Sequence, residues 1–368
     1  MTARRRITGN GMMDQYTQAA LNGSLVSPNW NNSAGGIRLS LDNKLPVPLY
    51  LYGVTTTGTQ SVNLSLDGSG EPLLFPAGES TPFIMYNNSF FIVRTAFSGA
   101  FVTLLYNQKG WSTATVTIDA SLLLPPNQIG LYPEPNPVMP IPPDSPRVLV
   151  GVGTTPTTPP NVIVREQFWQ RAGDSYLLAP GTKRTVSTTL ISGMQNTSSE
   201  QDAVSKSLGL SGSFGWGPVS ASLSANLSSS STSFQQVSVS TESTQYESLE
   251  LNNTTKHTQM FLRWQLTDVI TVFQTYTPSQ SMTEAAPVTG FPPPANGPGG
   301  MMPVTSITQV QSPIMISRDY KPGSLPAPPP PPPPPTTSIN MGSETYTASG
   351  LGAAALAKRP KPRARRQV

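Results

Sequence analysis

The sequence predicts an all-β protein, with an N-terminal β-sandwich followed by an elongated Ser/Thr-rich antiparallel β module. Three observations lead to this prediction. Short apolar segments separated by turn residues fill residues 34–122, a pattern typical of a sandwich. Apolar residues then fall at every second position through much of the Ser/Thr-rich residues 181–255. Proline, which makes up 40 of the 368 residues, gathers around these two segments and marks their boundaries.

The proline clusters divide the chain into five parts. Because proline fixes φ and lacks an N–H group, a stretch dense in proline is typical of a linker or a disordered tail. We therefore expect a flexible N-terminal segment (1–33), a β-sandwich that would act as a recognition domain (34–122), a proline-rich linker (123–160), the Ser/Thr-rich β module (161–320) with an amphipathic hairpin at 208–227, and a disordered polyproline and basic tail (321–368).

Individual strands follow from local patterns. In the sandwich, apolar residues alternate with polar ones or form short runs that end at turn pairs such as Asp67-Gly68. The strands expected there lie near residues 37–41, 49–54, 62–66, 90–93 and 101–106. In the β module, residues 260–274 predict a core strand whose apolar positions are Met260, Leu262, Trp264 and Leu266. Residues 14–21 have the composition of two helical turns.

Composition excludes several classes of function. The chain has no cysteine, so it has no disulfide, thiol nucleophile or thiolate metal site. A histidine-based zinc site or catalytic triad would depend on His257 alone, which lies in a polar segment and is expected to be an ordinary surface residue. We therefore expect no enzymatic activity, no catalytic residue, no cofactor and no metal.

Net positive charge is confined to the two ends of the chain. Arg4, Arg5 and Arg6 lie near the start, and residues 358–366 hold six further basic residues, whereas acidic residues outnumber basic ones between them. The basic tail would meet an anionic partner, lipid or nucleic acid, or remain solvated. The eight prolines 328–335 would dock a polyproline-binding domain or act as a stiff spacer.

Neither a secretory signal nor a transmembrane helix is recognisable. Residues 7–21, which follow the three arginines, are polar, and no stretch of 18 apolar residues occurs. We expect a protein that is soluble in the producing cell, leaves it by lysis or a dedicated route, and then associates with a target membrane.

Residues 208–227 predict a β-hairpin with one apolar face. Apolar residues occupy even positions before Gly217-Pro218 and odd positions after it, and no charged residue lies within the segment. A two-residue loop at Gly217-Pro218 pairs Trp216 with Val219 and Leu208 with Leu227, which places all apolar residues on one face. A glycine followed by a proline suits a type II′ turn.

The two faces suit lipid and water. Each arm of nine residues extends about 30 Å, and at a tilt of about 40° it spans about 23 Å, close to the apolar band of a membrane barrel. The residues predicted to face lipid are Leu208, Leu210, Phe214, Trp216, Val219, Ala221, Leu223, Ala225 and Leu227. The residues predicted to face the lumen are Ser211, Ser213, Ser220, Ser222, Ser224 and Asn226. Because one hairpin has open edges, several chains would have to form a ring.

The flanks of the hairpin are also consistent with strands. Residues 182–199 and 228–251 are Ser/Thr-rich and would continue the hairpin outside the membrane. Over residues 182–274 the pattern resembles that of the aerolysin-like β-pore-forming proteins. The resemblance implies a soluble monomer that binds a receptor on a target membrane, forms a homo-oligomer and inserts the hairpin. The spacer and the basic tail depart from that pattern.

A second interpretation fits the same residues. A hairpin with a serine face also occurs in ordinary sandwiches, with its apolar face on the core. The chain would then be a non-enzymatic structural or adhesive surface protein of a virion or cell envelope. The absence of Lys and Glu from the polar face favours the pore-forming interpretation, because solvent-exposed strands usually carry such charges.

Overall fold

A computed structural model confirms the all-β prediction. It describes residues 15–28, 36–64, 66, 70–86, 89–107, 115–130, 144–154, 160–194, 243–274, 304–320, 337–341 and 344–348. These residues form strands β1 to β16, the short helix α1 (Gln15–Leu21) and a 3-10 turn at Ala120–Leu122. Alternating burial in strands such as β1 and β5 follows from their alternating sequence.

The N-terminal half is a β-sandwich. Its strands are β1 (Gly36–Asn43), β2 (Leu49–Val54), β3 (Gln60–Val62), β4 (Leu74–Phe75), β5 (Ser80–Tyr86), β6 (Ser89–Thr95), β7 (Phe101–Asn107) and β8 (Thr115–Ile118). One sheet has the order β5-β1-β8, and β2, β6 and β7 belong to the facing sheet. Fully buried side chains from both sheets, among them Leu41, Phe83, Leu51 and Phe91, form the core between them.

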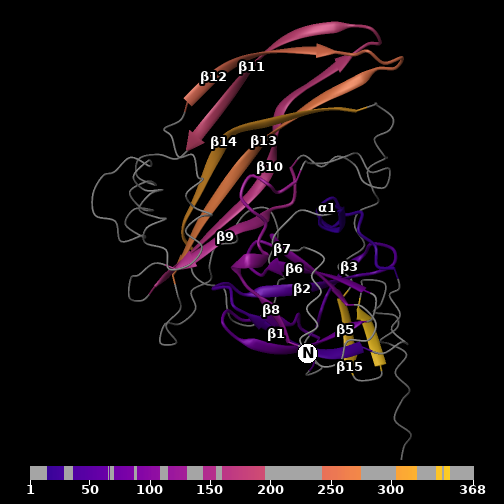
Figure 1. Cartoon of the computed structure of the whole chain (residues 1–368), viewed down its shortest axis with the longest axis vertical. Helices are drawn as coiled ribbons and strands as arrows, with labels where there is room; N and C mark the ends of the chain where they lie inside the picture. Colours follow the sequence, from indigo (N-terminus) through magenta and orange to yellow (C-terminus); the bar gives the residue numbers. More distant parts are fainter. Residues whose placement is uncertain are drawn as a thin grey trace, which may run out of the picture.

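The second half is built from long strands. They are β9 (Val148–Thr154), β10 (Asn161–Leu178), β11 (Lys183–Met194), β12 (Ser243–Asn252), β13 (Gln259–Gln274) and β14 (Val304–Tyr320). A further pair, β15 (Thr337–Met341) and β16 (Glu344–Ala348), forms a separate two-stranded sheet. β10, β13 and β14 rise steeply from the sandwich, and β11 and β12 arch over their upper end (Figure 1).

One hydrogen-bonded sheet joins the two halves. Its strand order is β12-β11-β14-β13-β10-β9-β7-β6-β2-β3, and β4 pairs with β2. Strand β9 makes the connection, because it pairs antiparallel with β10 and parallel with β7 through Phe101 and Val148. Residues 148–154 lie in the stretch that we assigned to the linker. They form a strand because VLVGVGT is free of proline and six of its seven residues are buried.

The first part of the chain also contributes to the core. Helix α1 lies within residues 1–33, which we expected to be flexible, but Ala20 and Leu21 are buried against β6, β7 and β13. The predicted core strand at residues 260–274 corresponds to β13, and its residue Trp264 is fully buried in the same cluster. The sheet of long strands is therefore covered on this face by α1 and by the segment that ends at Ile129.

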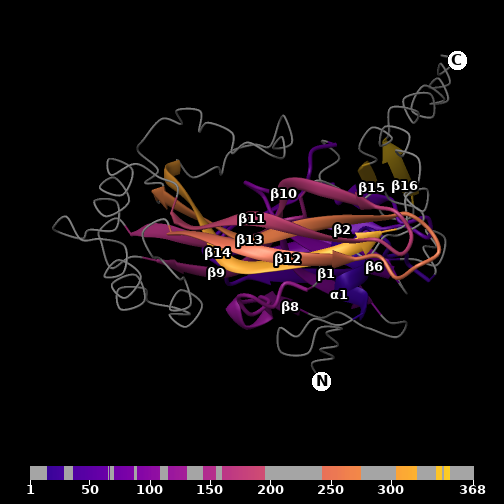
Figure 2. The same cartoon turned by 90° about the horizontal axis from the view of Figure 1, so that it is seen from above.

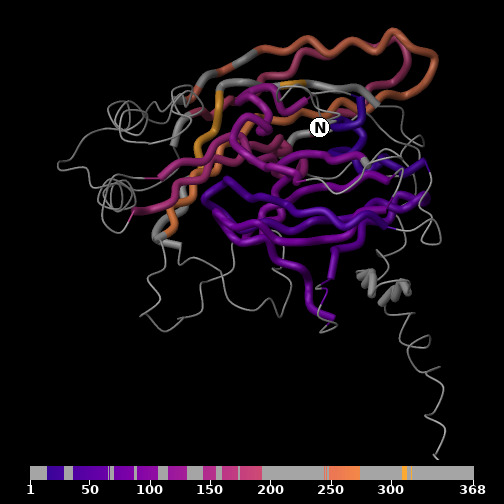
Figure 3. Tube along the Cα trace, turned by 60° about the horizontal axis from the view of Figure 1, so that its bottom comes forward, coloured from indigo at the N-terminus to yellow at the C-terminus, as the bar shows by residue number. Residues whose placement is uncertain are grey.

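Strands β11 and β12 form a two-stranded ribbon that turns back over the long sheet. From above, the ribbon lies over β13 and β14 (Figure 2). A third view shows it as the outermost layer, on the side away from the N-terminal strands (Figure 3). The ribbon joins the rest of the sheet at its far end, where Gly193 and Met194 pair with Gln311 and Val310 of β14.

Candidate functional site

The predicted hairpin, residues 208–227, lies outside the described residues, and so do all the residues predicted to face lipid or the lumen. The strands that lead into it and out of it are described. β11 ends at Met194 and β12 begins at Ser243, and the two are antiparallel neighbours. This two-stranded ribbon is therefore the described part of the candidate site.

The ribbon has two different faces. In β11 the even-numbered residues Val186, Thr188, Leu190 and Ser192 are buried, whereas Thr185, Ser187 and Thr189 are exposed. In β12 Leu251, which is odd-numbered, is buried, whereas Ser248 and Glu250 are exposed. Tyr246 is 84% exposed on the outer face. Even positions of β11 and odd positions of β12 thus share the inner face, as ladder partners must.

The ribbon meets the long sheet at a sharp bend, which we call the corner. It consists of residues 179–182, between β10 and β11, and residues 253–258, between β12 and β13. Beside the corner, a small apolar cluster joins Leu178 of β10 to Val186 and Leu251 of the ribbon. Tyr176, Leu249 and Phe261 pack against this cluster and are partly exposed.

Asn253 is the central polar residue of the corner. Its side chain is buried, and Nδ2 donates to the carbonyl oxygens of Leu178 at 2.9 Å and His257 at 2.8 Å. Its Oδ1 accepts from the N–H of Thr255 at 3.0 Å and from its hydroxyl at 2.7 Å. Its backbone carbonyl accepts from Gly181, whose φ of 68° suits a residue without a side chain. One amide therefore organises both loops of the corner.

Away from the corner, polar groups lie between the ribbon and the sheet. Gln265 of β13 is buried, and its Nε2 donates to the carbonyl oxygens of Ile191 at 2.6 Å and Ser312 at 2.8 Å. Arg263, on the same face of β13, and Thr188, on the inner face of β11, are also buried. This interface differs from the apolar core on the other face of the same strand.

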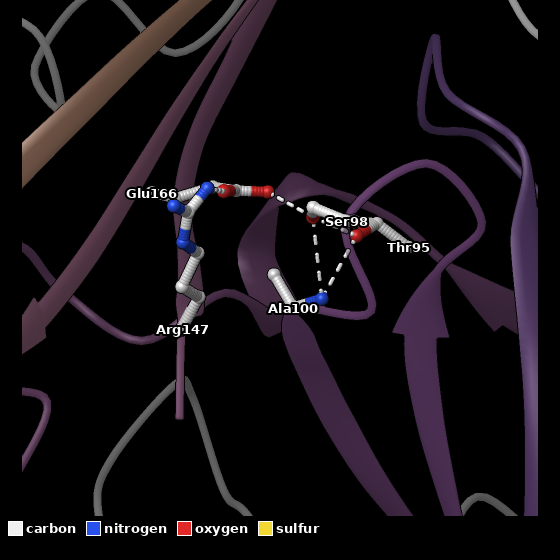
Figure 4. A network of polar contacts seen from close by, with 5 residues as sticks. All are labelled: Thr95, Ser98, Ala100, Arg147 and Glu166. Carbon is white, nitrogen blue, oxygen red and sulfur yellow. Dashed lines mark hydrogen bonds and ion pairs between the residues drawn. The ribbon is translucent and has the colours of Figure 1, made fainter. Parts of the chain in front are cut away.

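A second polar cluster lies where the sandwich meets β10. Glu166 of β10 accepts from the hydroxyl of Ser98, and its Oε2 lies 3.4 Å from Nη1 of Arg147 (Figure 4). Ser98 belongs to the turn between β6 and β7, where the N–H of Ala100 donates to the hydroxyl of Thr95 at 3.0 Å. The cluster therefore ties this turn to the start of the long sheet.

Burial changes the ionisation of Glu166. Desolvation raises the pKa of Glu166 above its ordinary value, and the hydrogen bond from Ser98 and the charge of Arg147 act in the opposite direction. The carboxyl group is 1% exposed and Arg147 is 15% exposed. The carboxyl group is buried and is held by Ser98 and Arg147, so its arrangement is that of a structural junction.

Neither a metal site nor a membrane-spanning helix is found in the described part of the chain. No group of three or more His, Asp or Glu side chains there is arranged to hold a metal ion. None of the helices in the same residues is long and apolar enough to cross a membrane. His257 is exposed at the corner, where it takes part through its backbone carbonyl.

Sequence analysis did not identify Asn253, Glu166 or Arg147 as important. Asn253 lies in a polar stretch with no distinctive pattern, and the corner brings it to Leu178, which is 75 positions away in the sequence. A sequence signal did exist for Glu166, since a charged pair, Arg165 and Glu166, interrupts the apolar run of β10. Its partner Ser98 is 68 residues away and could not be inferred.

The fold places this chain among all-β proteins with an elongated sheet, and comparisons with known proteins give little further detail. No protein-family model matches the sequence, and no curated protein matches it. Among solved structures, Cry35Ab1 aligns with 73% of this chain and 67% of its own, at 12% identity and a TM-score of 0.34. The oligomeric pore-forming toxin pro-Monalysin aligns with 50% of this chain and 72% of its own, at 13% identity and a TM-score of 0.26. Such weak likenesses say nothing about the activity of this chain.

Proposed function

We propose that this chain is a non-enzymatic β-pore-forming protein that binds a target membrane, oligomerises and inserts residues 208–227 as a continuation of the ribbon. The observation that carries the proposal is the register of the ribbon. In every ladder pair of β11 and β12, from Lys183↔Asn252 to Ser192↔Ser243, the two partners lie at equal distances along the sequence from the point between residues 217 and 218. A hairpin that continued these pairs would therefore have its loop at that point. Gly217-Pro218 is the loop predicted from the sequence of the hairpin alone.

The long strands below the corner support the same centre. In β10 and β13 the pairs from Asn161↔Gln274 to Arg171↔Trp264 are also centred between residues 217 and 218. The ladder of the ribbon, the lower ladder of β10 and β13, and the change of parity in the apolar pattern thus all indicate a hairpin loop at the same position. A single antiparallel hairpin with its tip at Gly217-Pro218 would extend the register of both ladders without a slip.

The inner face of the ribbon also matches the predicted lipid face of the hairpin. The inner face of the ribbon uses even positions of β11 and odd positions of β12. The predicted lipid face of the hairpin uses even positions before the loop and odd positions after it. If the strands continue in register, these positions lie on one side of a single ribbon, since a strand keeps its alternation as it lengthens. The polar outer face of the ribbon then leads into the predicted serine-lined lumen.

Release of a trapped dye from lipid vesicles tests the proposal. The purified wild-type chain is expected to release the dye from vesicles made of target-membrane lipid extract. Leu223 lies at the middle of the second arm, so Leu223→Arg would place a charge near mid-bilayer on the lipid face. Such a change costs about 2–4 kcal/mol per chain, and we expect the release to be lost.

The neighbouring residue provides a matched control. Ser222→Arg introduces the same charge at nearly the same depth, but on the predicted lumen face, where it meets water. We expect Ser222→Arg to release the dye and to change the ion selectivity of the conductance. Failure of the wild type to permeabilise any target membrane, or equal activity of both arginine variants, contradicts the proposal.

A further inference from the structure

We infer that the corner is a hinge about which the ribbon swings away from the long sheet, and that Asn253 is the latch that holds it folded back. This inference rests on the proposed function, because it describes how the strands leading to the hairpin become free to extend. It assigns a mechanical role to residues 179–182 and 253–258, which the proposed function by itself does not require.

Straightening the corner preserves the register of the strands on both sides of it. The ladder of β11 and β12 and the lower ladder of β10 and β13 share one centre. Two irregularities lie between these ladders. The bulge between Arg171 and Ser175 gives β10 two more residues than β13, and the corner loop 253–258 has two more residues than the loop 179–182 that faces it. The two offsets cancel, so both ladders keep their pairs whether the corner is bent or straight.

The surface that must separate is rich in polar groups. The inner face of the ribbon lies on buried polar groups of β13, including Arg263 and Gln265. In the described residues, the buried apolar side chains of the ribbon are Val186 and Leu251, in the small cluster around Leu178 at the corner, and Leu190 further along β11. Polar groups regain hydrogen bonds to water when such a surface opens, whereas an apolar core does not. The interface is therefore suited to opening.

The ribbon has few ladder pairs with the rest of the sheet. Of the 12 residues of β11, only Gly193 and Met194 pair with β14. β13 and β14, by contrast, pair from Met260↔Tyr320 to Phe273↔Val304. A ribbon attached at one end by a corner and at the other by two pairs separates as a unit more easily than a strand paired along its length.

Asn253 bridges the two sides of the hinge. Leu178 is the last residue of β10, on the sheet side, and Asn253 directly follows β12, on the ribbon side. The bond from Asn253 Nδ2 to the Leu178 carbonyl oxygen, 2.9 Å long and buried, therefore crosses the corner. Its second bond, to His257, fixes the loop that must unfold when the corner straightens. Losing both donors leaves buried carbonyl groups without this partner, which favours opening.

A removable staple tests the hinge. Met194 and Val310 are ladder partners across the junction of ribbon and sheet, so Met194→Cys with Val310→Cys brings two thiols within reach of a disulfide. The chain has no cysteine of its own, so no other disulfide can form within one chain. We expect the oxidised double variant to release dye from target-membrane vesicles no faster than protein-free buffer, and its reduction to restore the wild-type rate.

A control staple lies inside the ribbon. Ser187 and Ser248 are exposed ladder partners within β11 and β12, so Ser187→Cys with Ser248→Cys crosslinks the ribbon and leaves the corner free. Oxidation of this variant should leave the release rate unchanged. The hinge would be ruled out if the oxidised Met194–Val310 variant released dye as fast as the same protein after reduction. It would also be ruled out if oxidation of the Ser187–Ser248 control blocked dye release. If the reduced proteins and the wild type all fail to permeabilise vesicles, the proposed function itself is wrong.

Substitution of the latch gives an independent readout. Asn253→Asp keeps the acceptor for Thr255 but removes the Nδ2 donor, so we expect a shorter lag before dye release than in the wild type. The exposed neighbour Asn252→Asp makes the matching change in side-chain chemistry and should keep the wild-type lag. A lag that is equal or longer in a folded Asn253→Asp protein contradicts the role of Asn253 as the latch.

Discussion

Arg165 of β10 and Asp268 of β13 form an ion pair inside the long sheet, with Nε and Oδ1 2.6 Å apart and side chains 0% and 5% exposed. The next residue, Glu166, points to the other face of β10, toward Ser98 and Arg147. Two ion pairs therefore lie back to back at the level where the sandwich and the long strands meet. At this level β10 pairs with β13 on one side and with β9 on the other, where the register shifts between Arg165 and Glu166. The two ion pairs therefore add side-chain contacts between the segments that meet there.

Asp268→Asn tests the contribution of this ion pair to stability. The amide has similar shape but no charge, so the guanidinium of Arg165 remains buried without its carboxylate. Removing one partner of a buried pair costs about 3–5 kcal/mol, which would appear as a lower urea midpoint in an unfolding curve. The double variant Arg165→Met with Asp268→Leu should recover most of the loss, because it buries no charge. Equal midpoints for wild type and Asp268→Asn would show that the pair is not buried as described.

Glu166 makes the stability of the protein depend on pH. Burial raises the pKa of Glu166 above the ordinary value of 4.5, so the folded state binds a proton more tightly than the unfolded state. The stability from this proton is fully present below pH 4.5 and is lost as the pH rises through the raised pKa. We therefore expect the free energy of unfolding of the wild type, relative to Glu166→Gln, to increase as the pH falls from neutral.

Urea unfolding of both proteins at several pH values between 4 and 8 measures this dependence, since about 1.4 kcal/mol corresponds to each unit of pKa difference. Glu79→Gln, which alters an exposed carboxylate of the sandwich, should keep the wild-type dependence and serves as the control. A constant difference between wild type and Glu166→Gln across this range would contradict the raised pKa.

Local patterns predicted the class of the fold, but not the contacts between its parts. Alternation along β13 identified Trp264 and Leu266 as core residues, because the period of a strand is written in its own sequence. The junction through β9 was missed, since Val148 pairs with Phe101 across 47 positions and nothing local indicates that partner. The agreement between the ribbon register and Gly217-Pro218 could not be seen from the sequence either, because the Ser/Thr-rich flanks fit several registers equally well.

Two leucines of the long sheet test the assignment of its buried face. Leu266 of β13 is fully buried beside Trp264, whereas Leu177 of β10 is 63% exposed. Leu266→Ala removes buried apolar surface and leaves a cavity, so it should cost about 2–5 kcal/mol of unfolding free energy. Leu177→Ala makes the same chemical change on an exposed surface and should stay within about 0.5 kcal/mol of the wild type. Similar losses for the two variants in urea unfolding would mean that the faces are assigned wrongly.

A disulfide across the proposed hairpin tests its register in the membrane. With the proposed loop at Gly217-Pro218, Leu210 and Ala225 would be directly opposite each other, as they would also be if the ladder of the ribbon continued to that loop. Directly opposed residues have Cα atoms about 4.5–5.5 Å apart, within the range that a disulfide spans. We therefore expect Leu210→Cys with Ala225→Cys to form a disulfide on vesicles, measured as the loss of free thiols after mild oxidation.

The control for this crosslink shifts one partner along the same face. Leu210→Cys with Leu223→Cys joins a diagonal pair, for which the separation is about 7–8 Å and a disulfide would require movement of the backbone. Its thiols should stay free under the same oxidation. The opposite result, a crosslink at Leu223 and none at Ala225, would mean that the second arm is shifted by two residues relative to the first arm. The ladder of β11 and β12 would then not continue into the hairpin, and the central argument for insertion would be lost.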